Sequence, residues 1–226
     1  MNAPQAVITC EKKSIGTFAI HPSLPQCIPM NTDQFALVSS IFTLGGLLGA
    51  LLAGPWCNKL GRLRTMRVMT LFFIVGAILE SVAPSIAVLV IGRIIAGVGT
   101  GLSLVVVPIY ISEIAPPKEK GLFGALTQIM INLGILLTQV LGYFLSRDSW
   151  WRMILAVAAM IGIVQLTGLS LVPESPKWLA ENNNPQNARE LLRNIRGRKA
   201  DLDEEVKAWK VNSNADDIRR LSVKTE

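Results

Sequence analysis

The amino-acid sequence predicts an all-α membrane protein. Half of its 226 residues are hydrophobic and 17% are charged, which is too apolar a composition for an ordinary soluble domain. Long uncharged runs recur along the chain, and each reaches the roughly 20 residues that a helix needs to cross a bilayer. The alternating pattern of a membrane barrel is absent from the sequence, so helices are expected to satisfy the backbone within the lipid.

Five spanning helices are expected between residues 34 and 173. The runs at 34–58, 121–146 and 153–173 contain no charged residue. The run at 85–112 contains Arg93 as its one charge, and the run at 65–83 carries Glu80 near its end. The expected spans are 34–56, 65–83, 86–112, 121–145 and 152–172.

The connections between these runs predict the orientation. The stretch "CNKLGRLRTMR" carries four basic residues and no acid, whereas the connections around Ala83 and at "SRDSW" are short and nearly neutral. The positive-inside rule therefore places this stretch and the tail, 174–226, in the cytoplasm. The segment from about 9 to 33 then faces the outside or a lumen. Cys10 and Cys27 lie there and are candidates for a disulfide, with two free thiols as the alternative.

The tail predicts a short amphipathic helix under the membrane domain, in "NPQNARELLRNIRG". Leu191, Leu192 and Ile195 form an apolar stripe that arginines flank, and Gly197 can end the helix. A second short helix is a candidate over "DLDEEVKAWK". The whole of 174–226 is interpreted as a cytoplasmic helical linker.

Several function classes are not expected. The net charge of +6 comes from residues between the apolar runs and not from a basic face interleaved with aromatics, so nucleic-acid binding is excluded. One histidine and three cysteines leave little material for a metal site, and no cofactor is expected. The sequence has no HExxH motif and no paired intramembrane aspartates, so an intramembrane enzyme is rejected. No signal peptide is expected in the first residues.

Glycines in the run "GRIIAGVGTG" have two possible roles. A GxGxG motif can cradle a phosphate, but this one lies within a predicted span and follows no soluble strand. Small residues at four-residue spacing, in the pairs Gly97 with Gly101 and Gly45 with Gly49, let membrane helices approach closely. Packing is therefore the preferred role.

Three motifs, "GRIIAGVGTG…PIYISEIAPPKEKG", "PESPKWL" and "GRLRTM", together resemble the sugar porter branch of the major facilitator superfamily. The stretches "TQIMINLGILLTQVLG" and "WWRMIL" are similar to the family's fifth and sixth helices. The resemblance implies twelve spanning helices in two six-helix halves, with the substrate between the halves. This chain resembles the N-terminal bundle, from the end of helix one through helices two to six, followed by cytoplasmic amphipathic helices. Residues 1–33 correspond in this resemblance to the end of the first helix and an extracellular or lumenal loop.

The resemblance implies a sugar-binding face on the run 121–145. Gln128 matches a glutamine that contacts sugar hydroxyls, and an amide both donates and accepts, which suits a polyol. Gln139 lies three helical turns further, and Asn132 lies four residues after Gln128, so both can share that face. Ile131 would supply an apolar wall. For each amide, an interhelical hydrogen bond is the alternative.

The resemblance also implies gating and coupling residues. Arg93 matches an arginine that lies near a first-helix aspartate in proton-coupled relatives, and snorkelling at the membrane boundary is the alternative. The acids and bases at the cytoplasmic edges could pair in one state and separate in another, or they could be ordinary interfacial anchors. They are Glu113, Glu174, Arg62, Arg64, Lys120 and Lys177. The two lysines replace family arginines, which predicts a looser network.

The sequence therefore predicts transport of a hexose-like sugar by alternating access, in a multi-pass membrane protein. Its partners are the lipid bilayer and a small sugar. A proton is a candidate coupling ion, because symport and facilitated diffusion both stay open, as do the plasma and vacuolar membranes. The isolated half is expected not to transport. The alternative function is a truncated, non-transporting membrane protein that interacts with or regulates a full-length relative.

Overall fold

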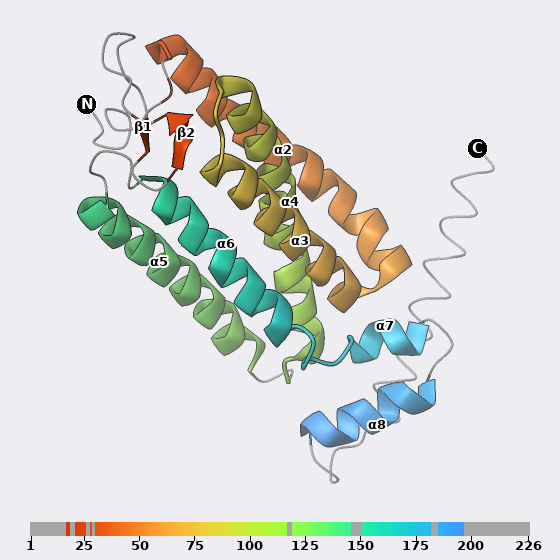
Figure 1. The fold of residues 1–226 in the computed structure, drawn as a ribbon. Helices are drawn as coiled ribbons and strands as arrows, with labels where there is room; N and C mark the ends of the chain where they lie inside the picture. The colour runs from red at the N-terminus through yellow and green to blue at the C-terminus, as the bar shows by residue number, and fades with distance from the viewer. Residues whose placement is uncertain are drawn as a thin grey trace, which may run out of the picture.

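The computed structural model describes residues 17–18, 21–25, 28, 30–116, 119–145, 151–181 and 185–196. Five long helices of this described part run alongside one another: α2 (Thr32–Leu60), α3 (Arg62–Ser81), α4 (Ile86–Ile114), α5 (Lys120–Leu145) and α6 (Trp151–Gly168). Two short helices, α7 (Pro176–Glu181) and α8 (Pro185–Arg196), lie at one end of this bundle (Figure 1). The all-α prediction for the membrane bundle is confirmed.

A small antiparallel hairpin precedes the bundle and is a feature that the sequence did not predict. It joins β1 (Thr17–Phe18) to β2 (His21–Pro25). The candidate disulfide between Cys10 and Cys27 and the candidate second tail helix over 201–210 lie outside the described residues.

The connection between α2 and α3 is shorter than the sequence suggested. Helix α2 continues through Pro55 to Leu60, and α3 begins at Arg62 and not at residue 65. Gly61 alone makes the turn, with a φ of 91°, a region that glycine enters without the steric penalty of a Cβ. The basic stretch is therefore mostly helical, and its arginines lie in the first turns of α3.

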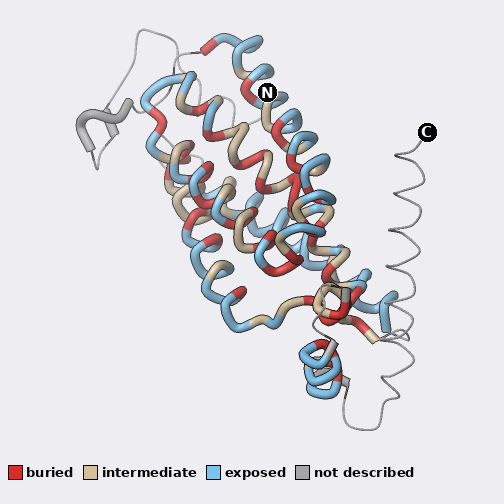
Figure 2. Tube along the Cα trace, turned by 90° about the vertical axis from the view of Figure 1, so that its right-hand side faces the viewer, coloured by how far each residue is buried: buried red, intermediate tan, exposed pale blue. Residues whose placement is uncertain are grey.

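Four described helices, α2, α4, α5 and α6, are long and apolar enough to cross a membrane. Helix α3 has 20 residues but is more charged, because its first turns carry Arg62, Arg64 and Arg67 and its last turn carries Glu80. Large apolar side chains are exposed on the bundle, among them Leu51 at 67% and Val164 at 69%. Figure 2 shows exposed positions along much of the traced backbone of the long helices. Such a surface suits contact with lipid chains.

Helices α2 and α4 pack with their backbones in contact. A Cβ added to Gly45 would lie 2.6 Å from the carbonyl oxygen of Ile94, and one added to Gly101 would meet the carbonyl of Gly46. The close packing that the glycine spacing predicts is confirmed. Helix α3 packs against α4 in the same way, since a Cβ on Gly76 would lie 2.6 Å from the backbone nitrogen of Ala96.

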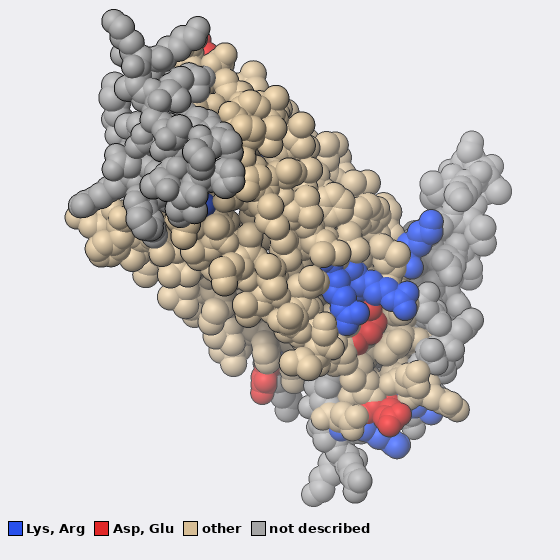
Figure 3. All heavy atoms as spheres, in the orientation of Figure 1, with Lys and Arg blue, Asp and Glu red and all other residues tan. Residues whose placement is uncertain are grey.

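Most charged side chains on the face shown in Figure 3 gather at one end of the bundle, near α7 and α8. We call this the basic end, and define it by Asn58–Arg67, by the last turn of α4 and by residues 173–178. The predicted amphipathic helix is present there as α8. Ala188 and Leu192 of α8 are buried in a small apolar cluster with Ala180 of α7.

Candidate functional site

A cavity of about 740 Å³ lies between α4 and α5. Helix α3 contributes Met69 to its lining and α6 contributes Gln165. Its volume falls within the roughly 300–1,000 Å³ that small-molecule sites occupy. The lining is mostly apolar, and its polar members are Ser103, Ser112, Lys120, Thr127, Gln128 and Gln165. The cavity therefore combines apolar walls with a few hydrogen-bonding groups.

The structure brings together part of the predicted sugar-binding face. Gln128 and Ile131 line the cavity. Asn132 stands one turn along, where its Oδ1 accepts a hydrogen bond from Nε2 of Gln128 at 3.5 Å. Gln139 is exposed on α5 and is not part of the cavity lining.

Four further polar lining residues escaped sequence reasoning, namely Ser103, Ser112, Thr127 and Gln165. The Ser103 hydroxyl donates to the carbonyl of Thr100 at 2.7 Å, and that of Thr127 donates to Phe123 at 2.9 Å. Each oxygen keeps a lone pair that can accept a hydrogen bond from a ligand. Gln165 is the one amide in the uncharged run 153–173. That isolation within an apolar run was the signal that could have found it.

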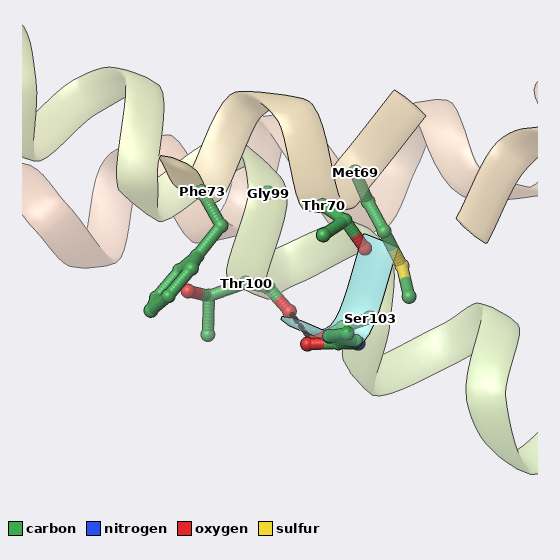
Figure 4. A pocket seen from close by; sticks show the side chains of 7 residues that line it. Met69, Thr70, Phe73, Gly99, Thr100 and Ser103 are labelled. Atoms are coloured by element: carbon green, nitrogen blue, oxygen red, sulfur yellow. Dashed lines mark hydrogen bonds between the residues drawn. The ribbon is translucent and has the colours of Figure 1, made fainter. Parts of the chain in front are cut away.

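A second pocket of about 210 Å³ adjoins the first and shares Met69, Ser103 and Gln165 with it. Figure 4 shows its walls, in which Thr70 and Phe73 of α3 face Thr100 of α4. The hydroxyls of Thr70 and Thr100 donate to carbonyls one turn back in their own helices. The two pockets thus form one polar-edged space beside α4.

At the basic end, Arg62 of α3 and Glu113 of α4 form a two-pronged ion pair. Nε donates to Oε2 at 2.9 Å and Nη2 donates to Oε1 at 2.7 Å. Both side chains are 7% exposed. The Ser175 hydroxyl adds a third hydrogen bond to Oε2 of Glu113, at 2.5 Å. A fork of this kind is a strong, directional contact, and its buried position limits screening by water.

Glu174 joins this cluster through the backbone. Its Oε1 accepts hydrogen bonds from the N–H of Leu63 at 2.8 Å and from the N–H of Ser175 at 3.0 Å. The Tyr110 hydroxyl donates to the carbonyl of Pro173 at 2.8 Å. The segment after α6 is thereby tied to both α3 and α4.

The remaining predicted bases are less buried than Arg62. Arg64 is exposed near the start of α3, and Lys177 is half-buried in α7. Lys120 is exposed at the start of α5 and lines the cavity. Of the predicted bases, Arg62 is therefore the one that the structure places on Glu113.

Arg93 lies toward the opposite end of the α3–α4 pair and contacts Glu80. Its Nε is 3.3 Å from Oε2 of Glu80, and the side chains are 32% and 5% exposed respectively. The guanidinium carbon also lies 6.0 Å from the ring centroid of Phe42 in α2. Sequence reasoning assigned no role to Glu80, and the structure makes it the counter-charge of Arg93.

No metal centre is formed by the described residues, among which no three His, Cys, Asp or Glu side chains gather. Apolar helices of membrane-spanning length, a buried charge cluster at one end and amides beside a cavity that opens to the surface define a helical membrane protein. A family model described as "Sugar (and other) transporter" matches residues 5–225, and the chain belongs to this family.

Curated relatives carry transporter and other names. The chain is 37% identical over 183 residues to the glucose transporter GlcP of Staphylococcus epidermidis, covering 81% of this chain and 41% of GlcP. It is 34% identical over 226 residues to vacuolar protein sorting-associated protein 73 of Saccharomyces cerevisiae, covering 96% of this chain and 46% of the relative. The chain therefore spans under half the length of these relatives.

Solved structures give the same fold. The proton:xylose symporter XylE, of the major facilitator superfamily, matches with a TM-score of 0.74 and 26% identity, covering 80% of this chain and 44% of XylE. A partially occluded inward-open form of XylE from E. coli matches with a TM-score of 0.71 and 27% identity, covering 48% of that chain. The fold is the N-terminal helical bundle of this superfamily.

Proposed function

We propose that this chain forms the N-terminal half of a sugar transporter that moves a hexose-like sugar by alternating access. One observation carries the proposal: Gln128 and Gln165 both line a cavity of about 740 Å³. These two neutral amides come from different helices, and each lies in a run without charged residues. The names of relatives support the substrate class, since GlcP is a glucose transporter and XylE a xylose symporter. Because the chain spans under half of these relatives, the remaining walls of the site would come from a second half.

In this proposal the amides contact the sugar and the apolar residues shape the site. Gln128 donates to and accepts from sugar hydroxyls, and the contact with Asn132 orients it. Ile131 packs against the apolar face of the ring. Gln139, which lies beyond the cavity, is assigned to contacts with another helix or with the second half.

The basic-end cluster is proposed to act as a gate. The Arg62–Glu113 fork, with Glu174 and Ser175, joins the start of α3, the end of α4 and the segment after α6 into one body. Alternating access requires such a body to rock against its counterpart. Arg64, Lys120 and Lys177 would then pair with groups of the second half in one state and lose those contacts in the other.

The coupling ion and the membrane are further parts of the proposal. A proton is proposed as the coupling ion, because the relative XylE is a proton:xylose symporter. The plasma membrane and the vacuolar membrane are both proposed locations. Proton symport would be recognised by sugar-induced alkalinisation of the external medium, which facilitated diffusion does not produce.

Uptake into proteoliposomes tests the proposal, using the complete gene product that contains this chain. Saturable uptake of radiolabelled glucose is expected. Gln128→Ala should raise KM about tenfold or more, because sugar hydroxyls lose their partner in a site built to bind them. The matched control is Thr167→Ala, a change on α6 outside both pockets. Uptake no faster than in empty liposomes, or an unchanged KM in Gln128→Ala, would contradict the proposal.

A second candidate function rests on the exposure of α5. Added Cβ atoms at Gly124, Gly134 and Gly142 would meet nothing within 4 Å, and the helix exposes large apolar residues such as Leu133 and Leu136. This surface suits binding to a full-length relative, which the chain would regulate without transporting. Co-purification of such a relative with a 24.6 kDa product, and not with a longer one, would favour this function.

A further inference from the structure

Two arginine–glutamate pairs join α3 to α4, one toward each end of the helix pair, and their polarity is reversed. At the basic end the arginine is on α3 and the glutamate on α4, as Arg62 and Glu113. Toward the opposite end the glutamate is on α3 and the arginine on α4, as Glu80 and Arg93.

Helix electrostatics do not favour Glu80 where it stands. It lies in the last turn of α3, where the helix dipole is negative and repels a carboxylate. Its side chain is 5% exposed, and burial of an unpaired charge is costly. Gly92 of α4 nevertheless leaves room for the Glu80 side chain, because a Cβ on Gly92 would lie 2.8 Å from Cγ of Glu80. Glu80 therefore depends on Arg93 for its charge balance.

The backbone position of Arg93 lies on the face of α4 that borders the two pockets. Whole helical turns separate it from Thr100, Leu104, Val107 and Ile111, so these residues share one face of α4. Thr100 lines the smaller pocket, and the other three line the larger cavity. The guanidinium is instead drawn sideways to Glu80 and Phe42. Without Glu80, the long side chain would be free to lie along the cavity face.

The geometry of this pair is looser than that of the pair at the basic end. Arg62 and Glu113 share two hydrogen bonds and are both 7% exposed. The shortest contact between Arg93 and Glu80, from Nε to Oε2, is 3.3 Å, and among the described residues that nitrogen has no partner at hydrogen-bonding geometry. The Arg93 side chain as a whole is 32% exposed, against 7% for Arg62, so less of it is held by surrounding protein. This pair can open at lower cost.

We propose that Glu80 is a positioning residue for Arg93. It holds the guanidinium against α3 and off the cavity face of α4, and it releases the guanidinium to that face in another state of the transport cycle. The release of Arg93 to the cavity face rests on the proposed function. The docking of Arg93 by Glu80 concerns this chain alone and can be tested without transport.

The position of Arg93 can be measured with an arginine-directed reagent. The full chain in detergent is treated with phenylglyoxal, and modification of Arg93 is followed by mass spectrometry. Glu80→Gln should increase the rate at Arg93 about tenfold, because the docked side chain loses its ionic partner. Glu80→Asp should stay near the unaltered chain, and Glu119→Gln is the matched control, an exposed glutamate on another segment. Exposed Arg64 serves as the internal reference. An unchanged rate in Glu80→Gln overturns the proposal.

A double variant distinguishes loss of the Glu80–Arg93 pair from general misfolding. Because Glu80→Gln removes the counter-charge of Arg93, the melting temperature of the chain should fall, and adding Arg93→Gln should restore it. A double variant no more stable than the weaker single variant overturns the pairing. If Glu80→Gln fails to fold and the double variant folds, the pairing is supported.

The release of Arg93 to the cavity face during transport is tested in the complete gene product. A merely structural Glu80 would lower the amount of active protein and therefore Vmax, while KM stayed constant. A guanidinium released onto the cavity face should instead change the KM for glucose about threefold or more, and Glu80→Asp should restore it. Absence of any wild-type uptake contradicts the proposed function but leaves the labelling result decisive for Glu80. Normal wild-type uptake with unaltered labelling in Glu80→Gln overturns the inference about Glu80 alone.

Discussion

Helix α4 has two unlike sides. Toward α2 and α3 its backbone is in direct contact with its neighbours, at Gly97 and Gly101 on one helix and Gly99 on the other. Toward α5 it borders a cavity of about 740 Å³ edged by amides and hydroxyls. The packed side is a scaffold that fixes three helices as one body. The open side keeps polar groups available to a ligand.

The difference shows that a glycine predicts close helix packing only where the facing helix also has a small residue. Both α2 and α5 carry several glycines, and from the sequence alone either helix could pack closely. In α2, Gly45 and Gly49 meet the backbone of α4, at Ile94 and Val98. In α5, Gly134 has nothing within 4 Å of an added Cβ. Close packing thus needs small residues at matching heights on both helices.

The largest effect is expected from breaking the buried fork on the packed side. Glu113→Ala leaves Arg62 buried without its counter-charge, which should destabilise the chain by about 3–5 kcal/mol. The measurement is the thermal unfolding midpoint in detergent, followed by tryptophan fluorescence. The control is Glu119→Ala, which removes an exposed carboxylate. Equal midpoints for the two variants would show that the fork contributes nothing to this body.

A matched pair of glycine variants tests the two sides of α4 directly. Gly101→Val forces a branched side chain onto the backbone of Gly46, and a loss of about 3 kcal/mol is expected. Gly134→Val, in α5, should change stability by less than about 0.5 kcal/mol, because the added atoms meet open space. Similar losses for both would mean that α5 is packed as tightly as α2, and the comparison would fail.

A smaller effect is expected where the segment after α6 is tied to α4. Tyr110→Phe removes the hydrogen bond to the carbonyl of Pro173 and keeps the ring in place, so about 1 kcal/mol should be lost. Tyr143→Phe is the control, since Tyr143 is 81% exposed. A drop in melting temperature of equal size in the control would show that the Tyr110–Pro173 hydrogen bond does not stabilise the chain.

The smallest effect on stability is expected on the open side. Gln165→Ala should leave the melting temperature nearly unchanged, because Gln165 is exposed in the cavity wall. It should raise the KM for glucose uptake about fivefold in the complete gene product, through loss of one hydrogen bond to the sugar. A large loss of stability without a change in KM would identify Gln165 as a packing residue.

Much of the fold follows from local sequence, and much of the candidate site does not. Uncharged runs predict the long helices because the lipid excludes charged side chains. The pairing of Glu80 with Arg93 depends on how α3 crosses α4, which no local pattern encodes. Gln165 joins the cavity because α6 lies beside α5, a long-range arrangement. Gly61 shortens the first connection through its backbone conformation, and the sequence showed only a basic loop.

The most direct test of the account is glucose counterflow in proteoliposomes that contain the complete gene product. Vesicles are loaded with unlabelled glucose and diluted into a trace of labelled glucose. Exchange across a sugar transporter predicts a transient accumulation of label inside the vesicles, above its final equilibrium level, which mannitol loaded in place of glucose does not produce. A monotonic approach to equilibrium, equal to that of vesicles without protein, would contradict the assignment of sugar transport.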